Sequence, residues 1–187
     1  VADGPLTSQL QNIRVGDELL VNSKATGTLV LDNLLPGRNL YLLGTGTGLA
    51  PFLSIIKDPA IYERFERVIL AHGCRNVSEL AYQDAITREL PTHEYLGDEI
   101  RGKLIYYPTV TREAFRNTGR LTDLLRNDTL PADVGLPPID PDNDRFMLCG
   151  SPSMLKDMGA LLNERGFQES RHGKAAHYVI ERAFVES

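Results

Sequence analysis

The most informative stretch of this chain is Asn39-Leu40-Tyr41-Leu42-Leu43-Gly44-Thr45-Gly46-Thr47-Gly48-Leu49-Ala50-Pro51-Phe52. The apolar run at residues 40–43 has the length and composition of a buried parallel strand. Glycine then stands at every second position, and a proline suited to the first turn of a helix follows. We therefore expect a strand, a tight turn and a helix, in that order.

The three glycines of this turn indicate a ligand that presses on the backbone. Glycine tolerates positive φ and has no Cβ to block an approaching group, while the free N–H groups at a helix start attract a phosphate. A plain strand-to-helix turn remains open, because the stretch lacks both G-x-G-x-x-G and the lysine of a phosphate-binding loop.

From residue 37 onward, strands alternate with helical periods. Buried strands are predicted at residues 67–73, 103–109, 145–149 and 177–184, in addition to 40–43. Helices are expected over residues 76–90, over 121–125, and from Pro152 to a stop at Gly166, with a surface loop at 127–144. This alternation predicts an α/β fold built on a five-stranded, doubly wound parallel sheet.

Residues 1–36 have a different pattern. A short helix is predicted over residues 7–13 and short strands over 18–21 and 28–31, which are too few to close a barrel. We place the boundary near Leu35-Pro36-Gly37, so that residues 1–36 and 37–187 form two parts.

Composition excludes several classes of function. The formal charge of −5 argues against general nucleic-acid binding, and no apolar run approaches the ~18 residues needed to span a bilayer. The two cysteines, Cys74 and Cys149, form no C-x-x-C pair, which fits a reducing compartment and predicts a cytoplasmic location.

Several chemically capable side chains follow the predicted strand ends, where ligands bind in doubly wound sheets. Four of them are arginines, whose planar fork suits a phosphate monoester: Arg75, Arg112, Arg116 and Arg120. The alternative, surface arginines paired with Glu79 or Glu113, remains open at this stage.

The remaining candidates have competing interpretations. Cys149 precedes a glycine at a strand end, so it either contacts a bound ring or is a small buried hydrophobe, and no adjacent base marks it as a nucleophile. The Glu181 carboxylate is expected to be exposed to solvent, paired with a neighbouring residue, or kept for function, because burying an unpaired charge costs free energy. His72 and His177 are interpreted as structural, and no metal site is predicted.

Five motifs together resemble the ferredoxin–NADP reductases, and the last one resembles the bacterial ferredoxin/flavodoxin–NADP reductases. They are Gly4-Pro5-Leu6-Thr7-Ser8, residues 44–52, His72-Gly73-Cys74-Arg75 with Glu79-Leu80-Ala81-Tyr82, Cys149-Gly150-Ser151-Pro152, and Tyr178-Val179-Ile180-Glu181-Arg182-Ala183-Phe184-Val185-Glu186. The family's Arg-x-Tyr-Ser segment is absent. The chain therefore looks like an NADP-binding α/β domain, residues 37–187, preceded by the C-terminal part of an FAD-binding β-barrel, residues 1–36.

The resemblance implies site residues. For NADP they are Thr45, Gly46, Thr47, Gly48, Leu49, Ala50, Pro51, Arg75, Arg112, Arg120, Cys149, Gly150 and Ser151, with the three arginines on the 2′-phosphate. For FAD they are Gly4, Pro5, Leu6, Thr7, Ser8, Ala183, Phe184, Val185 and Glu186. Cys149 and Glu181 are implied as the catalytic residues beside the hydride path.

The implied activity is electron transfer between NADP(H) and ferredoxin or flavodoxin, by hydride transfer between nicotinamide and FAD, in a monomer that binds neither nucleic acid nor membranes. Two alternatives remain open. One is an NADPH-dependent reductase component that serves another acceptor. The other is an NADP-binding module that is inactive without the absent FAD-binding segment.

Overall fold

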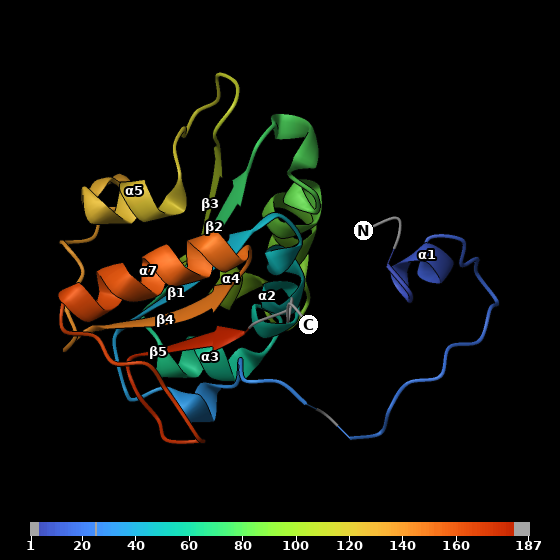
Figure 1. The fold of residues 1–187 in the computed structure, drawn as a ribbon, viewed down its shortest axis with the longest axis horizontal. Helices are drawn as coiled ribbons and strands as arrows, with labels where there is room; N and C mark the ends of the chain where they lie inside the picture. Colours follow the sequence, from blue (N-terminus) through green and yellow to red (C-terminus); the bar gives the residue numbers. More distant parts are fainter. Residues whose placement is uncertain (1–3, 25, 182–187) are drawn as a thin grey trace.

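The computed structural model describes residues 4–24 and 26–181 and contains a five-stranded parallel sheet with the order β3-β2-β1-β4-β5 (Figure 1). The strands are β1 Asn39–Thr45, β2 Arg67–Cys74, β3 Leu104–Val110, β4 Asp144–Cys149 and β5 Tyr178–Glu181. All five strands were predicted from the sequence, with ends that differ by a few residues.

Helices cover both faces of the sheet, as a doubly wound fold requires. Three of them pack on one face: α2 Leu49–Ile55, α3 Pro59–Arg64 and α4 Gly97–Lys103. The other face is covered by α5 Leu121–Arg126, α6 Thr129–Asp133 and α7 Pro152–Glu164, and Figure 1 shows α7 lying across it. The predicted α/β fold is confirmed.

The sequence of β1 explains why it lies in the middle of this sheet. Successive side chains of a strand point to opposite faces. Leu40 and Leu42 therefore pack with the α2 side, whereas Tyr41 and Leu43 pack with the α7 side, and all four are fully buried. A strand that is covered on both faces needs a continuous apolar run, which is what residues 40–43 provide.

Helix α7 begins and ends where its sequence predicts. The Met154 N–H donates to the Ser151 side-chain oxygen at 3.3 Å, so Ser151 caps the helix, and Pro152 occupies the first turn. Gly166, just after the C-cap, has φ +85°.

The predicted helix over residues 76–90 is only partly present. Residues 83–92 are helical and include a π-helical turn, η4 Ala85–Glu89, and a final 3-10 turn, η5 Leu90–Thr92, whereas η3 Val77–Glu79 is a separate 3-10 turn. The Glu79 carboxylate accepts a hydrogen bond from the Arg75 N–H, one residue before the expected N-cap, and thereby closes a tight loop. Tyr82 then adopts φ +62° and is exposed, which breaks the helical period.

The strands predicted at residues 18–21 and 28–31 are also absent, so the described residues before β1 contain no strand and form no closed barrel. The segment contains α1 Thr7–Leu10, shorter than predicted, and η1 Leu31–Asn33, and Figure 1 shows its first part extending away from the sheet. Extended backbone becomes a strand only when another strand satisfies its N–H and C=O groups, and none does so among the described residues.

The connection into β1 is held firmly. The Arg145 guanidinium, almost fully buried, donates to the carbonyl oxygens of Leu35 and Pro36, with the Leu35 contact at 3.1 Å. Arg64 donates to the carbonyl oxygen of Leu31 at 2.6 Å. The predicted boundary near residues 35–37 is therefore a fixed connection to the sheet.

None of the helices in residues 4–24 and 26–181 has the length and apolar character needed to cross a bilayer.

Candidate functional site

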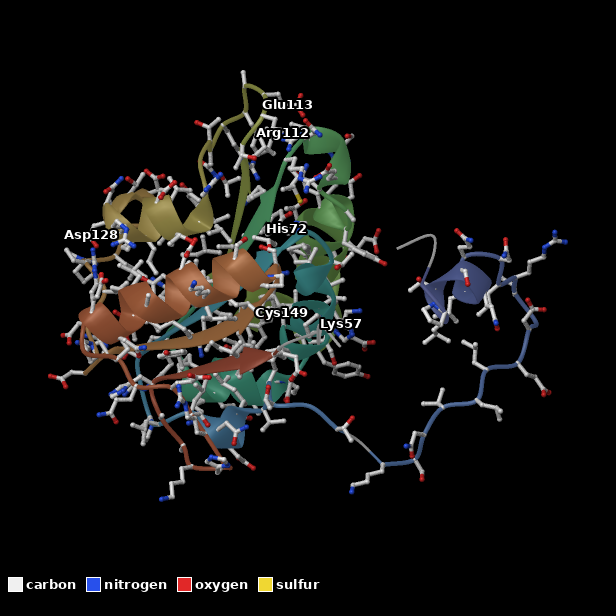
Figure 2. The ribbon with its side chains drawn as sticks, in the orientation of Figure 1. Lys57, His72, Arg112, Glu113, Asp128 and Cys149 are labelled. Atoms are coloured by element: carbon white, nitrogen blue, oxygen red, sulfur yellow. The ribbon has the colours of Figure 1, made fainter. Side chains whose placement is uncertain are left out.

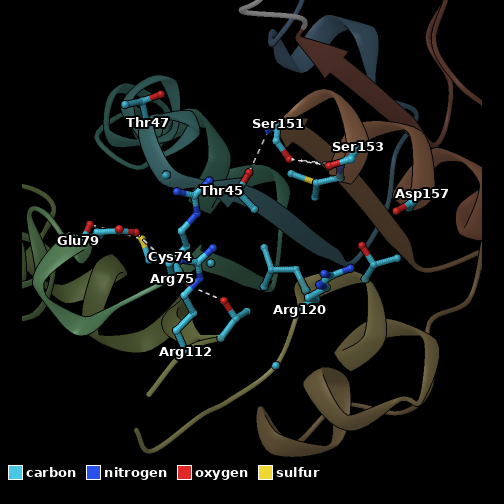
Figure 3. A pocket seen from close by; sticks show the side chains of 17 residues that line it. Thr45, Thr47, Cys74, Arg75, Glu79, Arg112, Arg120, Ser151, Ser153 and Asp157 are labelled. Carbon is cyan, nitrogen blue, oxygen red and sulfur yellow. Dashed lines mark hydrogen bonds between the residues drawn. The ribbon is translucent and has the colours of Figure 1, made fainter. Parts of the chain in front are cut away.

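A cleft of about 730 Å³ lies at the carboxyl ends of the strands, next to the point where the chain order reverses between β1 and β4 (Figure 3). Its lining consists of Thr45, Gly46, Thr47, Gly73, Cys74, Arg75, Glu79, Thr111, Arg112, Gly119, Arg120, Leu121, Thr122, Ser151, Ser153, Met154 and Asp157. The cleft therefore collects residues from four separate turns of the sequence.

The turns after β1 and after β4 are locked together at one side of the cleft. The Ser151 N–H donates to the Thr45 hydroxyl oxygen at 3.0 Å. A Cβ on Gly48 would overlap the carbonyl oxygen of Cys149, and a Cβ on Gly150 would overlap the Thr45 side chain. Both glycines are thus required for the close approach of the two turns, although neither lines the cleft.

The glycine turn is supported from behind by His72. Its Nε2 lies 3.0 Å from the carbonyl oxygen of Gly46, and because a carbonyl only accepts, this nitrogen carries the proton. Burial lowers the pKa of His72, which favours the neutral ring. His72 and Cys149, both labelled in Figure 2, are buried. The prediction that His72 is structural agrees with this contact.

Three of the four predicted arginines meet in the cleft. Arg75, Arg112 and Arg120 line it, and Figure 3 shows their side chains extending into it. The Arg112 N–H donates to the Arg75 carbonyl oxygen at 2.9 Å, which ties two of the arginine-bearing loops together. Arg116 is absent from the lining and stacks on Phe115, with its guanidinium carbon 5.5 Å from the ring centroid.

The three cleft arginines do not form the close ion pairs with Glu79 or Glu113 that the alternative interpretation requires. Among the described residues, none of the three cleft guanidinium groups has a carboxylate within ion-pair distance. Glu79 and Glu113 accept backbone N–H groups instead, from Arg75 and Val77. The charge of Arg75 interacts with Glu79 only at longer range. Three guanidinium groups without a close ion-pair partner among the described residues are suited to a multiply charged anion.

Sequence reasoning missed several lining residues. Ser153 and Asp157 stand four residues apart on α7 and so share a face, a spacing that could have identified them once the helix was placed. Cys74 is the last residue of β2 and Thr111 follows β3, and nothing in the residues alone distinguished them.

Cys149 and Glu181 are neighbours at the carboxyl end of the sheet. They are register partners across β4 and β5, and Cys149 is also the partner of Gly44 on β1. Burial, and secondarily the charge of Glu181, raises the pKa of the Cys149 thiol, so it stays protonated and is unsuited to act as a nucleophile. The Glu181 carboxylate accepts hydrogen bonds from Thr28.

The predicted flavin residues are not brought to this cleft. Gly4, Pro5, Leu6, Thr7 and Ser8 lie in and before α1, in the segment that extends from the sheet in Figure 1. Ala183, Phe184, Val185 and Glu186 lie outside the described residues. The remaining predicted coenzyme residues, Leu49, Ala50 and Pro51, form the start of α2. No group of three or more metal-ligating side chains occurs in the described part of the chain.

This geometry fits an elongated ligand with a flat ring and phosphate groups. The backbone of the glycine turn and the turn at Gly150-Ser151 provide a smooth surface at one end. The three arginines provide positive charge at the other side of the same cleft.

Comparisons with known proteins agree with this assessment. The sequence pattern of the oxidoreductase NAD-binding domain matches residues 42–159. A ferredoxin–NADP reductase from Pseudomonas aeruginosa is 63% identical over 187 residues, which are 100% of this chain and 72% of that protein. A flavodoxin/ferredoxin–NADP reductase from Rhodobacter capsulatus is 44% identical over 185 residues, 99% of this chain and 68% of that protein.

A solved structure is similar as well. The crystal structure of a ferredoxin NADP⁺ reductase from Neisseria gonorrhoeae, with bound FAD and NADP, superposes with a TM-score of 0.84 at 30% identity. The match covers 98% of this chain and 72% of that one. Sequence motifs, fold and relatives therefore lead to one conclusion: the chain belongs to the ferredoxin–NADP reductase family.

Proposed function

We propose that this protein is a flavin-dependent oxidoreductase that binds FAD and NADP(H) and transfers electrons between NADP(H) and ferredoxin. One observation carries the proposal: the glycine turn after β1, the turn after β4 and three arginines without ion-pair partners meet in one cleft of a member of this family.

We assign the arginine side of the cleft to the 2′-phosphate of NADP. Arg75, Arg112 and Arg120 provide the charge, and a phosphate monoester is the part of NADP that NAD lacks. The residues at 45–51 and 149–151 then flank the nicotinamide, because their closely packed backbones leave room for a flat ring. This assignment predicts a preference for NADP over NAD.

We assign flavin binding to the two ends of the chain, residues 4–8 and 183–186. In this proposal residues 1–36 are the C-terminal part of an FAD-binding barrel and residues 37–187 are the NADP domain. When bound, FAD supplies the chemistry that takes up a hydride and releases single electrons. The relative from Neisseria gonorrhoeae, which contains both FAD and NADP, supports this assignment.

We assign Cys149 and Glu181 to the edge of the hydride path. The protonated Cys149 thiol is buried and packs in the cluster that contains Leu49 and Phe52 of α2. Glu181, its register partner, places a carboxylate at the same edge of the sheet. In this role the two residues shape the environment of the reacting rings.

Ferredoxin is the proposed electron partner, and the name of the Rhodobacter capsulatus relative supports flavodoxin as a second one. We further propose a cytoplasmic location, because the two cysteines are unpaired and fit a reducing compartment. We also propose that the protein is a monomer.

The test uses the purified chain loaded with FAD and freed of unbound flavin. NADPH is added without oxygen, flavin absorbance is followed, and oxidised ferredoxin is then added. Bleaching of the flavin followed by reduction of ferredoxin is the expected result. Bleaching without ferredoxin reduction would indicate a reductase for another acceptor, and NADP binding without flavin retention would indicate an NADP-binding module.

A further inference from the structure

Thr28 lies 153 residues before Glu181 and contacts its carboxylate twice. The Thr28 N–H and the Thr28 hydroxyl both donate to Glu181 Oε2, each at 2.6 Å. The hydroxyl oxygen is also 2.8 Å from the carbonyl oxygen of Ile180, the preceding residue of β5. A residue of the proposed flavin-binding part is therefore fastened to the end of the coenzyme-binding sheet.

Thr28 is itself held in place. Gly27, with φ +135°, turns the chain toward the sheet, and the Asn33 side-chain amide donates to the Thr28 carbonyl oxygen at 2.8 Å. Farther along the same segment, the Leu35 N–H donates to the Ala176 carbonyl oxygen at 2.9 Å. These contacts fix the Thr28 hydroxyl relative to β5, so it can constrain its partner.

Glu181 needs such a partner because its carboxylate is carried on a flexible side chain at the last residue of β5. Two hydrogen bonds to one oxygen restrict the torsions of that side chain before any ligand binds. A hydroxyl can also either donate or accept. Here the Thr28 hydroxyl donates to Glu181 Oε2 and also lies within hydrogen-bond distance of the Ile180 carbonyl oxygen.

We propose that Thr28 is a positioning residue that holds the Glu181 carboxylate at the edge of the hydride path beside Cys149. This inference rests on the proposed function, in which Glu181 borders the reacting rings. Accurate placement of a group beside the reacting atoms changes the reaction rate more than it changes the affinity for the ligand. The role of Thr28 should therefore affect the rate of hydride transfer and leave coenzyme binding unchanged.

The test is made on the flavin-loaded enzyme by stopped-flow measurement of flavin reduction over a range of NADPH concentrations. Thr28→Val keeps the shape and the backbone N–H but removes the hydroxyl. We expect its limiting rate to fall by about tenfold, with the half-saturating NADPH concentration within about twofold of wild type. Thr28→Ser should restore most of the rate, and Thr26→Val, an exposed neighbouring threonine, should match wild type.

A double variant separates positioning from general damage. If Thr28 acts through Glu181, Thr28→Val should cost little further rate in a Glu181→Gln background, because the carboxylate whose placement affects the rate is then absent. Equal losses in both backgrounds, an unchanged rate in Thr28→Val, or an unchanged rate in Glu181→Gln would each overturn the inference. A wild-type enzyme that does not reduce its flavin with NADPH would overturn the proposed function as well, which distinguishes the two failures.

Discussion

The Nε2–H of His72 donates a hydrogen bond to the carbonyl oxygen of Gly46 across 3.0 Å. This contact joins β2, which is buried except at Arg67, to the turn that lines the cleft, at the one residue of that turn with positive φ, +53°. The shape of the proposed coenzyme-binding turn therefore depends on a side chain that lies outside the cleft.

Replacing His72 should weaken coenzyme binding. His72→Phe leaves the Gly46 carbonyl without its hydrogen-bond donor. An unsatisfied buried acceptor costs about 1–3 kcal/mol of free energy, so the turn should shift to find another donor. We expect NADP⁺ affinity to fall by about tenfold, measured by calorimetric titration. His172→Asn, at an exposed residue with φ +54°, is the control and should bind as wild type, since asparagine tolerates this conformation. Equal affinity in His72→Phe would contradict the role of the contact.

The same histidine should make stability depend on pH. Burial lowers the pKa of His72 below the ordinary value of about 6.5 that it recovers in the unfolded chain. Below that value the unfolded state binds the proton more readily, so the free energy of unfolding falls as the pH drops, whereas above it the contribution is constant. His177, with a pKa lowered by burial and by Arg145, acts in the same direction.

The measurement is the thermal midpoint at pH 7.5 and pH 5.5 for wild type and for His72→Gln. Glutamine does not titrate, so the variant should lose less stability between the two conditions. An identical decrease in both proteins would assign the pH dependence to other groups.

Gly48 should not tolerate a side chain. A Cβ on Gly48 would overlap the carbonyl oxygen of Cys149, a backbone atom that cannot rotate away. Gly48→Ala should lower the free energy of unfolding by about 3 kcal/mol and abolish NADP binding. Gly102→Ala is the matched control: this glycine lies in α4 with no atom within 4 Å of the added methyl, so we expect about 0.5 kcal/mol of stabilisation. Urea denaturation measures the free energy of unfolding of both variants.

The arginines should determine the choice of coenzyme. If Arg112 and Arg120 contact the 2′-phosphate, changing both to alanine should remove much of the preference for NADP over NAD, at about 1.5–3 kcal/mol for each charge-assisted contact. The ratio of the two binding constants measures this preference. Arg116→Ala removes a positive charge from the same loop but outside the cleft lining, so it should leave the ratio nearly unchanged. An unaltered ratio in the double variant would remove these arginines from the phosphate site.

Patterns among residues that are adjacent in the chain predicted much of the fold. The apolar run at 40–43 and the glycines after it predicted a buried parallel strand followed by a tight turn, and Ser151-Pro152 predicted the start of α7. These predictions succeed because hydrophobic period and capping act over a few residues. The first half of the helix predicted over 76–90 is missing because a single contact, from the Arg75 N–H to Glu79, closes a loop that the period does not reveal.

The sequence alone therefore determined the order of strands and most helices, and its resemblance to a family selected Arg75, Arg112 and Arg120 from the four candidate arginines. Only the tertiary structure decided that these three line one cleft without Arg116, and that Thr28 contacts Glu181. These arrangements join residues up to 153 positions apart, and they depend on strand register and on the packing of the segment before β1. No local pattern encodes such a contact, because its energy is gained only when the whole sheet has formed.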